Sequence, residues 1–194
     1  MRRFITSTAL IAALGFTPIA NAQEAAAEDS SEFDIGQSVA PGVGDPYMGE
    51  TFGDWAFRCV KAPEGQEDQC NLYQLLINDE GVSVAEVSIF KLPEGGQAQA
   101  GATIVVPLET FLPEQLTLAV DGENARVYPY RFCNRAGCVA RIGLTAAEVA
   151  QLKAGANGSL RIVPAATPSS EVVLNISLSG FTAGYDALAA LPVE

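Results

Sequence analysis

Short runs in which apolar and polar residues alternate are the strongest constraint on how this chain folds. In the runs from Leu116 to Asp121 and from Val172 to Ser179, every second residue is a large aliphatic one. A period of two turns one set of side chains toward a core and the other toward solvent, as in a strand of a half-buried sheet. Further strands are expected over 55–60, 70–77, 82–91, 102–108, 125–133, 140–144 and 159–163.

Turn-forming residues separate these runs at 78–81, 94–96 and 121–124. One helix is expected to begin at Thr145, which forms a capping box with Glu148, and to end at Gly155 in a left-handed conformation. A second short helical turn is expected over 185–191. About nine strands with one or two short helices predict a mostly β fold, an antiparallel β-sandwich or a partly open β-barrel.

Four cysteines, Cys59, Cys70, Cys133 and Cys138, indicate two disulfides if the chain is exported. Their spacing favours Cys59–Cys70 and Cys133–Cys138, because each pair brackets turn-like residues; the other two connectivities stay open. A catalytic redox role for Cys133 and Cys138 is the alternative, but the pair lacks the C-x-x-C spacing of such enzymes. A zinc site of all four cysteines is disfavoured because neither pair has the two-residue gap typical of such sites.

The N-terminus has the pattern of an export signal. Arg2 and Arg3 precede an apolar stretch over 4–20, and Ala20 and Ala22 form an A-x-A cleavage site. The apolar stretch is shorter than the roughly 20 residues that a spanning helix needs, so residues 1–22 are expected to be a cleaved signal peptide. The mature chain is then exported without a transmembrane span. We expect it in the periplasm, with outer-membrane association or secretion as alternatives.

Residues 23–50 contain seven acidic residues and no basic residue. Such a segment buries too little apolar surface to offset the entropy of ordering, so an acidic disordered tail is expected there. Residues 51–194 are expected to form a single β-rich domain. The whole chain has a formal net charge of −12, which argues against nucleic acid as a partner, because phosphates repel an acidic surface.

Composition and motifs also limit the chemistry. The chain has no histidine, which excludes Ser-His-Asp and Cys-His nucleophile pairs and every histidine-containing metal site. The sequence lacks a G-x-S-x-G elbow, a phosphate-binding P-loop and a dinucleotide fingerprint. Acidic groups at 79–80 and 121–124 could offer oxygens to Ca²⁺, but both coincide with turns and neither has the spacing of a calcium loop. No cofactor and no metal ion are expected.

One basic cluster stands out in this acidic chain. Four arginines lie within 16 residues and alternate with aromatic residues between 126 and 141. Arginine and tyrosine are frequent binding hot spots, so this segment is the candidate contact surface, with Arg126, Tyr128, Tyr130, Arg131 and Arg135 as its residues. On one continuous strand, Tyr128, Tyr130 and Phe132 would share one face, with Arg131 on the other. The alternative is that the aromatic residues belong to the core and the arginines to a solvated face.

Several motifs together resemble the invasion-associated locus B family. They occur in the family's order over about residues 51–190: Phe52-Gly53-Asp54-Trp55, Cys59, Cys70 with Gln74, Val106-Pro107-Leu108, Leu118-x-Val120-Asp121-Gly122, Cys133, Gly137-Cys138 and Leu178-Ser179-Gly180-Phe181. The resemblance implies an exported, compact, β-rich protein of mostly alphaproteobacterial cells, with a role in host-cell invasion in pathogenic members. It implies structural disulfides at the four cysteines and carries no catalytic motif.

These observations lead to the expectation of a non-enzymatic interaction protein of the envelope or cell surface, whose partner is an unknown envelope or surface protein. A periplasmic small-ligand binder or a carboxylate-dependent hydrolase is the alternative, because acidic residues are numerous. A deep cleft that holds two carboxyl groups with raised pKa values would favour the alternative.

Overall fold

The computed structural model describes residues 35–191. The chain divides into a first unit that ends at Val39 and a second that begins at Ala40. Of the first unit, the described residues 35–39 are exposed and have no regular secondary structure. The expected signal peptide, and the expected tail up to residue 34, lie outside the described residues.

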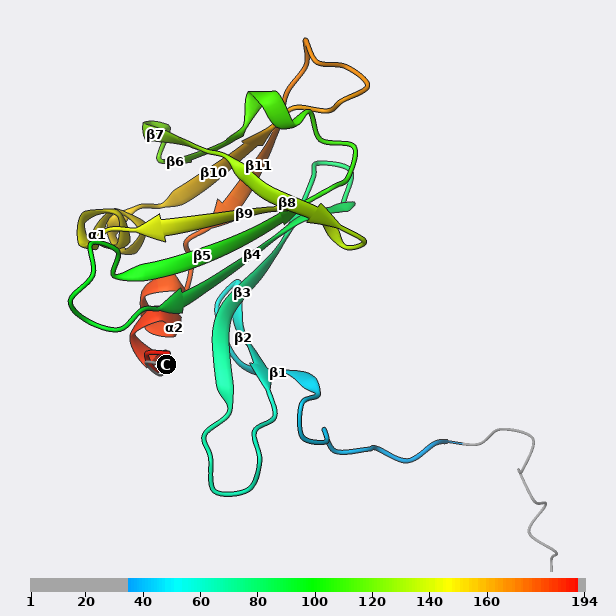
Figure 1. Ribbon diagram of the computed structural model, residues 1–194, viewed down its shortest axis with the longest axis vertical. Helices are drawn as coiled ribbons and strands as arrows, with labels where there is room; N and C mark the ends of the chain where they lie inside the picture. Colours follow the sequence, from blue (N-terminus) through cyan, green and yellow to red (C-terminus); the bar gives the residue numbers. More distant parts are fainter. Residues whose placement is uncertain (1–34, 192–194) are drawn as a thin grey trace, which may run out of the picture. The chain divides into compact units, whose positions relative to one another are not determined.

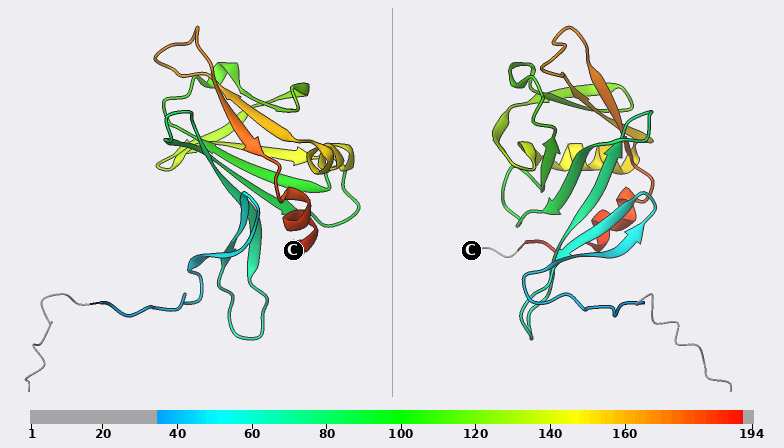
Figure 2. Two further views of the ribbon diagram at one scale, coloured as in Figure 1. Left: turned by 180° about the vertical axis from the view of Figure 1, so that it is seen from behind. Right: turned by 90° about the vertical axis from the view of Figure 1, so that its right-hand side faces the viewer.

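Two antiparallel sheets form the second unit, as Figures 1 and 2 show. The larger sheet has seven strands, in the spatial order β1 (Pro46–Phe52), β2 (Trp55–Val60), β3 (Gln69–Ile77), β4 (Ser83–Lys91), β5 (Ala100–Val106), β9 (Gly137–Leu144) and β8 (Tyr130–Asn134). The smaller sheet has four strands, in the order β11 (Val172–Ser177), β10 (Asn157–Ile162), β6 (Leu116–Val120) and β7 (Glu123–Tyr128). Three short helices accompany them: the 3₁₀ turn η1 (Leu112–Glu114), α1 (Ala146–Ala154) and α2 (Phe181–Ala187).

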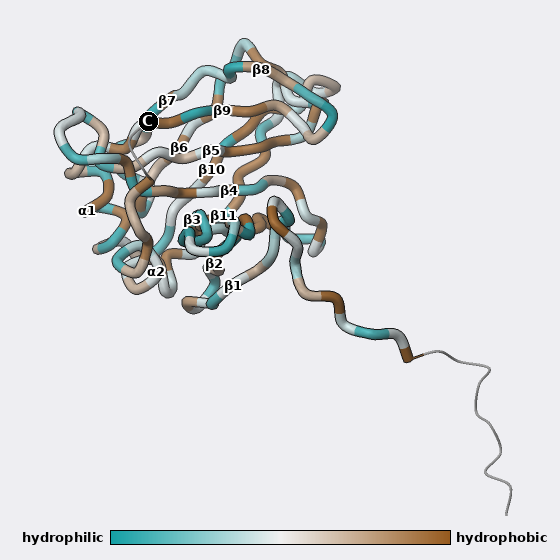
Figure 3. The backbone as a smooth tube through the Cα atoms, turned by 60° about the horizontal axis from the view of Figure 1, so that its bottom comes forward, coloured by the Kyte–Doolittle hydropathy of each residue, from teal (hydrophilic) through white to brown (hydrophobic). Residues whose placement is uncertain are grey.

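The core lies between the two sheets, which are not closed into a barrel. One cluster of buried residues combines Leu72 and Ile104 of the larger sheet with Leu116, Leu160 and Leu174 of the smaller one. Hydrophobic residues recur along β4, β5 and β9 in Figure 3, as the alternating pattern requires. The sequence-based expectation of a mostly β, antiparallel sandwich is therefore confirmed.

Both disulfides that the spacing favours are present. Cys59–Cys70 joins β2 to β3, and Cys133–Cys138 joins β8 to β9, so each closes a hairpin. On the loop-entropy model, a 12-residue loop stabilises the fold by about 3 kcal/mol and a six-residue loop by about 2 kcal/mol. Each bridge therefore adds stability to a hairpin whose two strands are already adjacent in the sequence.

Several element boundaries differ from the expectations. Strand β1 begins at Pro46, so the last five residues of the expected tail belong to a strand, and Pro46, Tyr47 and Met48 among them pair with β2. The second helix covers Phe181–Ala187 rather than 185–191, because Phe181, Tyr185 and Leu188 bury one helical face. The capping box at Thr145 is confirmed, but Gly155 has an extended conformation with φ of −74° instead of a left-handed one.

A polar network joins the turn between β1 and β2 to the end of β11. The indole Nε1 of Trp55 donates to the carbonyl of Ser177 at 2.7 Å. The side chain of Gln74 donates to the same carbonyl at 3.1 Å and accepts from the Ser177 N–H at 3.0 Å. Asp54 accepts from the Ser177 hydroxyl and donates its own N–H to the Ser179 carbonyl at 3.2 Å. These contacts give a structural role to Asp54 and Trp55, near the start of the folded chain, and to Ser177 and Ser179, near its end.

Candidate functional site

The segment expected as one strand over 125–133 is two strands in two different sheets, so this expectation is wrong. Strand β7 ends at Tyr128 and β8 begins at Tyr130, with Pro129 between them. Proline lacks the N–H that a ladder needs, and here the chain leaves the smaller sheet and enters the larger one. The basic cluster therefore lies around a corner of the sandwich rather than along one strand.

A β-bulge at Arg131 reverses the expected pattern of faces. Tyr130 is opposite Ala140, but Phe132 is opposite Val139, so β8 has one residue more than β9 at this point. Tyr130 consequently packs against the core, whereas Phe132 shares the outer face of the sheet with Val139 and stays 46% exposed. The expectation that Tyr128, Tyr130 and Phe132 share one face is wrong for this reason.

The two tyrosines of the candidate contact surface are half-buried. Tyr128 and Tyr130 both pack against the core. Burial raises the pKa of Tyr130 to about 12. Burial, reinforced by the negative charge of Glu148, raises the pKa of Tyr128 to about 12 as well. Both phenols therefore stay protonated near neutral pH. Tyr128 packs and donates a hydrogen bond to Glu148, whereas Tyr130 acts by packing, because its buried hydroxyl has no hydrogen-bond partner among the described residues.

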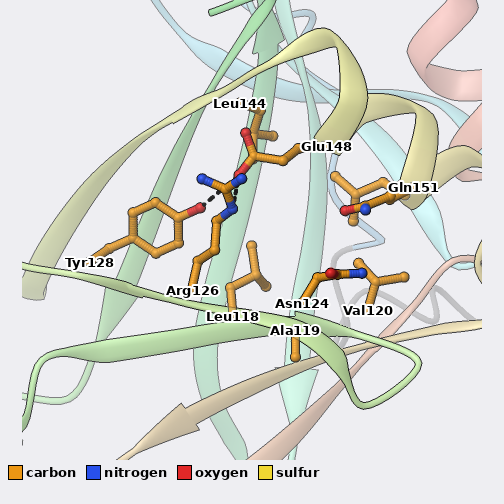
Figure 4. Close-up of a pocket in the computed structure, with 10 residues that line it drawn as sticks. Leu118, Ala119, Val120, Asn124, Arg126, Tyr128, Leu144, Glu148 and Gln151 are labelled. Atoms are coloured by element: carbon orange, nitrogen blue, oxygen red, sulfur yellow. Dashed lines mark hydrogen bonds and ion pairs between the residues drawn. The ribbon is translucent and has the colours of Figure 1, made fainter.

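Arg126 and Tyr128 both bind one buried carboxylate, that of Glu148 at the start of α1 (Figure 4). Oε1 of Glu148 accepts from Arg126 Nε at 2.9 Å and from the Tyr128 hydroxyl at 3.2 Å. Oε2 accepts from the N–H of Thr145 at 2.8 Å and from its hydroxyl at 2.6 Å. Through Glu148, the N-terminus of α1 is therefore hydrogen-bonded to strand β7 of the smaller sheet.

This carboxylate has little capacity left for a substrate. Its four hydrogen bonds occupy both oxygens, and the side chain is only 10% exposed. The cavity beside it measures about 20 Å³, which is close to the space that one water molecule needs. Burial raises the pKa of Glu148, but the hydrogen bonds from Thr145 and Tyr128 and the charge of Arg126 outweigh it, so the pKa lies below its ordinary value.

Replacing Glu148 with glutamine is expected to remove a pH-dependent part of the stability. Because the pKa of Glu148 is lower in the folded than in the unfolded state, its contribution is complete above about pH 4.5 and is lost as pH falls through the folded value. We expect E148Q to lower the free energy of unfolding by about 1–2 kcal/mol at pH 7. Urea unfolding at several pH values measures this difference, which should shrink toward pH 3.

The matched control is Glu123→Gln, which removes an exposed negative charge from the neighbouring strand β7. The free energy of unfolding of E123Q should equal that of the wild-type protein at every pH. A difference between E148Q and wild type that stays constant from pH 7 to pH 3 would contradict the assignment.

A larger groove of about 500 Å³ lies between residues 66–70 and the segment 187–191. Asp68 lines it, but its carboxylate already accepts from the Tyr47 hydroxyl, the Ala62 N–H and the Lys61 ammonium. The hydrogen bonds from Tyr47 and Ala62 and the Lys61 charge lower the pKa of Asp68. The Asp68 carboxyl group is therefore ionised and held by partners, whereas a general acid near neutral pH requires a raised pKa.

The acidic turns have structural partners. Asp121 accepts from the N–H groups of Ala156 and Asn157 and so holds the connection after α1. Asn78 accepts from the N–H groups of Glu80 and Val82 and so closes its own turn. Within residues 35–191, no group of three or more acidic or cysteine side chains is arranged to hold a metal ion. In the same range, no helix has the length and apolar character to cross a membrane.

The nine basic residues of the described chain fall into three groups. Five of them form ion pairs: Arg58, Lys61, Arg126, Lys153 and Arg161. Lys91 donates to the carbonyls of Asp186 and Leu188 at the end of α2. The other three, Arg131, Arg135 and Arg141, are exposed and have no ion pair among residues 35–191.

All three unpaired arginines lie on the β8–β9 hairpin at one edge of the larger sheet. We call Arg131, Phe132, Arg135 and Arg141 the arginine edge. Two residues of the candidate contact surface, Arg131 and Arg135, belong to it, whereas Arg126, Tyr128 and Tyr130 are held by Glu148 or the core. Phe132 was outside that prediction, and only the bulge reveals its exposure. That these residues form a contact surface stays a prediction.

Comparison with known proteins supplies the relatives of the chain. The family model described as Invasion associated locus B (IalB) protein matches residues 55–189. Two curated proteins named invasion protein B homologue, from Brucella abortus strain 2308 and from Brucella abortus biovar 1 strain 9-941, are each 26% identical over 142 residues, covering 73% of this chain and 79% of the relative.

A solved structure agrees with the fold. The crystal structure of invasion associated protein B from Bartonella henselae superposes with a TM-score of 0.57 at 26% sequence identity. The match covers 71% of this chain and 90% of the Bartonella chain.

Proposed function

The chain belongs to the invasion-associated locus B family, and on this premise we propose that it is an exported, non-enzymatic interaction protein of the bacterial envelope. Two observations support export: the signal-like sequence over residues 1–22 and two disulfides, which persist mainly in oxidising compartments. The names of the Brucella and Bartonella relatives connect those proteins with invasion. For this chain the proposal is envelope interaction, in the periplasm or at the outer membrane.

The arginine edge carries this proposal. The chain has a formal net charge of −12, yet the three described arginines that have no ion pair lie together on one hairpin. An exposed aromatic side chain, Phe132, lies among them. Unpaired arginines beside an exposed aromatic ring have the composition of a binding hot spot, and an isolated positive patch on an acidic protein selects partners by charge.

Site-specific photo-crosslinking in cells tests this function. A photoreactive amino acid replaces Phe132 in the tagged full chain, and the covalent adducts are identified by mass spectrometry. The matched control places it at Val173, which is 58% exposed on β11, an edge strand of the other sheet. We expect one or a few envelope proteins attached at 132 and at least tenfold less of them at 173.

Charge reversal adds a second criterion. R131E/R135E should reduce the adduct at 132 at least tenfold, whereas R161E should leave it unchanged, because Arg161 lies on β10 and is paired with Glu171. If position 132 yields no envelope adduct, the proposed function loses its support and the search should turn to small ligands. Equal adduct yields in R131E/R135E and wild type would remove the arginine edge as the contact surface.

A further inference from the structure

We propose that the arginine edge binds an extended, acidic segment of its partner, which adds as a further strand beside β8. The inference rests on the proposed function, because it concerns the same surface, and it specifies how that surface binds.

Strand β8 is the last strand of the larger sheet, so one of its sides has no neighbouring strand among residues 35–191. Cys133 and Cys138 are opposite each other, with 4.0 Å between their Cα atoms. Antiparallel pairs this close are those that exchange no backbone hydrogen bonds with each other. The N–H and C=O of Cys133 therefore point away from β9, toward the open side, where an added strand would bond to them.

The edge is also held in place before any partner arrives. The disulfide ties β8 to β9, and Tyr130 anchors the start of β8 in the core. Just before β8, Tyr128 at the end of β7 donates a hydrogen bond to Glu148 on α1. A strand fixed in this way loses little conformational entropy when a partner binds, which favours strand addition.

The side chains determine which strand would fit. Arg131 and Arg135 lie on β8 and on the turn that follows it, and Arg141 projects from the neighbouring β9. With no carboxylate in the described chain to neutralise them, they favour a partner rich in aspartate or glutamate. Phe132, exposed on the outer face, favours a partner that also carries aliphatic side chains. The matching segment therefore combines acidic with aliphatic residues, and a strand of alternating glutamate and valine is the simplest example.

A second copy of this chain fits the edge poorly. Two β8 strands paired antiparallel about a two-fold axis would bring the Arg131 and Arg135 side chains of both copies together, and like charges across strands are destabilising. Head-to-tail pairing with strand β1 of another copy, at the opposite edge of the sheet, would offer only one carboxylate, Glu50, to the three arginines. The arginines thus select against self-pairing and for an acidic partner strand.

Fluorescence anisotropy on the purified full chain tests strand addition directly. The probe is a nine-residue fluorescein-labelled peptide in which glutamate and valine alternate, with blocked ends. We expect the wild-type protein and R161E to bind it with affinities within twofold of each other. R131E/R135E should bind at least tenfold more weakly, and a peptide with lysine in place of glutamate should not bind.

Backbone methylation of the peptide separates strand addition from simple charge attraction. An edge strand directs alternate N–H groups toward its neighbour, so N-methylation of all glutamates and N-methylation of all valines must have different effects. One of the two should weaken binding at least tenfold and the other less than threefold. The amide of Cys133 should also become protected from hydrogen exchange when the unmodified peptide is bound.

Two results would overturn the inference: equal binding by both methylated peptides, and equal binding of the unmodified peptide to R131E/R135E and wild type. If either is found while the crosslink at position 132 persists, strand addition is wrong and the proposed function stands. If the crosslink is also absent, both are wrong.

Discussion

Trp55→Ala is expected to lower the free energy of unfolding by about 3–5 kcal/mol, which is the usual cost of truncating a fully buried aromatic side chain. Trp55 is 1% exposed, and its ring meets Phe181 edge to face at 5.4 Å between centroids. The substitution therefore opens a cavity where β2 meets α2. In a protein of this size we expect the melting temperature to fall by roughly 10 °C.

Circular dichroism is the appropriate measurement, because Trp55 is the only tryptophan and W55A has no tryptophan fluorescence to follow. Trp55→Phe is the matched control: it keeps an aromatic ring and loses the hydrogen bond to Ser177. The Ser177 carbonyl still accepts from Gln74, so W55F should cost clearly less than W55A. A melting temperature of W55A within 2 °C of wild type would show that Trp55 does not belong to the core.

Gly180→Ala is expected to be comparably damaging, for a different reason. Gly180 precedes α2 with φ of +83°, a conformation that costs a residue with a Cβ atom about 1–3 kcal/mol. An added Cβ would also lie 1.9 Å from the carbonyl oxygen of Phe52 and 2.7 Å from the N–H of Gly53. Those are backbone atoms of the turn that Trp55 follows, and they cannot move without opening the network at Ser177. The total loss should reach about 3–5 kcal/mol.

Gly65→Ala separates the two contributions. Gly65 has φ of +85°, nearly the same as Gly180, but nothing lies within 4 Å of the position its Cβ would take. G65A should therefore cost only the conformational penalty, about 1–3 kcal/mol, and less than G180A. Urea unfolding of both variants measures the difference. If G180A and G65A lose the same stability, the close approach of Gly180 to Phe52 is unimportant.

Local patterns in the sequence predicted much of the fold. Strands β6 and β11 follow from alternation alone, because a period of two depends only on neighbouring residues. The start of α1 follows from Thr145 and Glu148, three residues apart, for the same reason. The disulfide pairs also follow locally, since each closes one hairpin. The corner at Pro129 had a signal in the sequence, a proline inside an expected strand, which our interpretation of residues 125–133 passed over.

The candidate site was predicted less completely. The sequence located the basic cluster, but it did not show which arginines keep an unpaired charge. Arg126 and Arg131 look equivalent in the sequence, yet only Arg126 meets a carboxylate, because β7 lies beside the start of α1. Phe132 looks like a core residue until the bulge at Arg131 moves it to the outer face.

The sequence by itself determined the secondary structure class, the hairpins and their cross-links, since these depend on residues close together in the chain. Only the tertiary structure decided which charges are neutralised, which strand edge stays open and which glycines meet another segment. Those properties depend on pairs such as Arg126 with Glu148 and Gly180 with Phe52, which are far apart in the sequence. The packing of the two sheets brings the members of each pair together. No pattern among neighbouring residues in the sequence predicts that they meet.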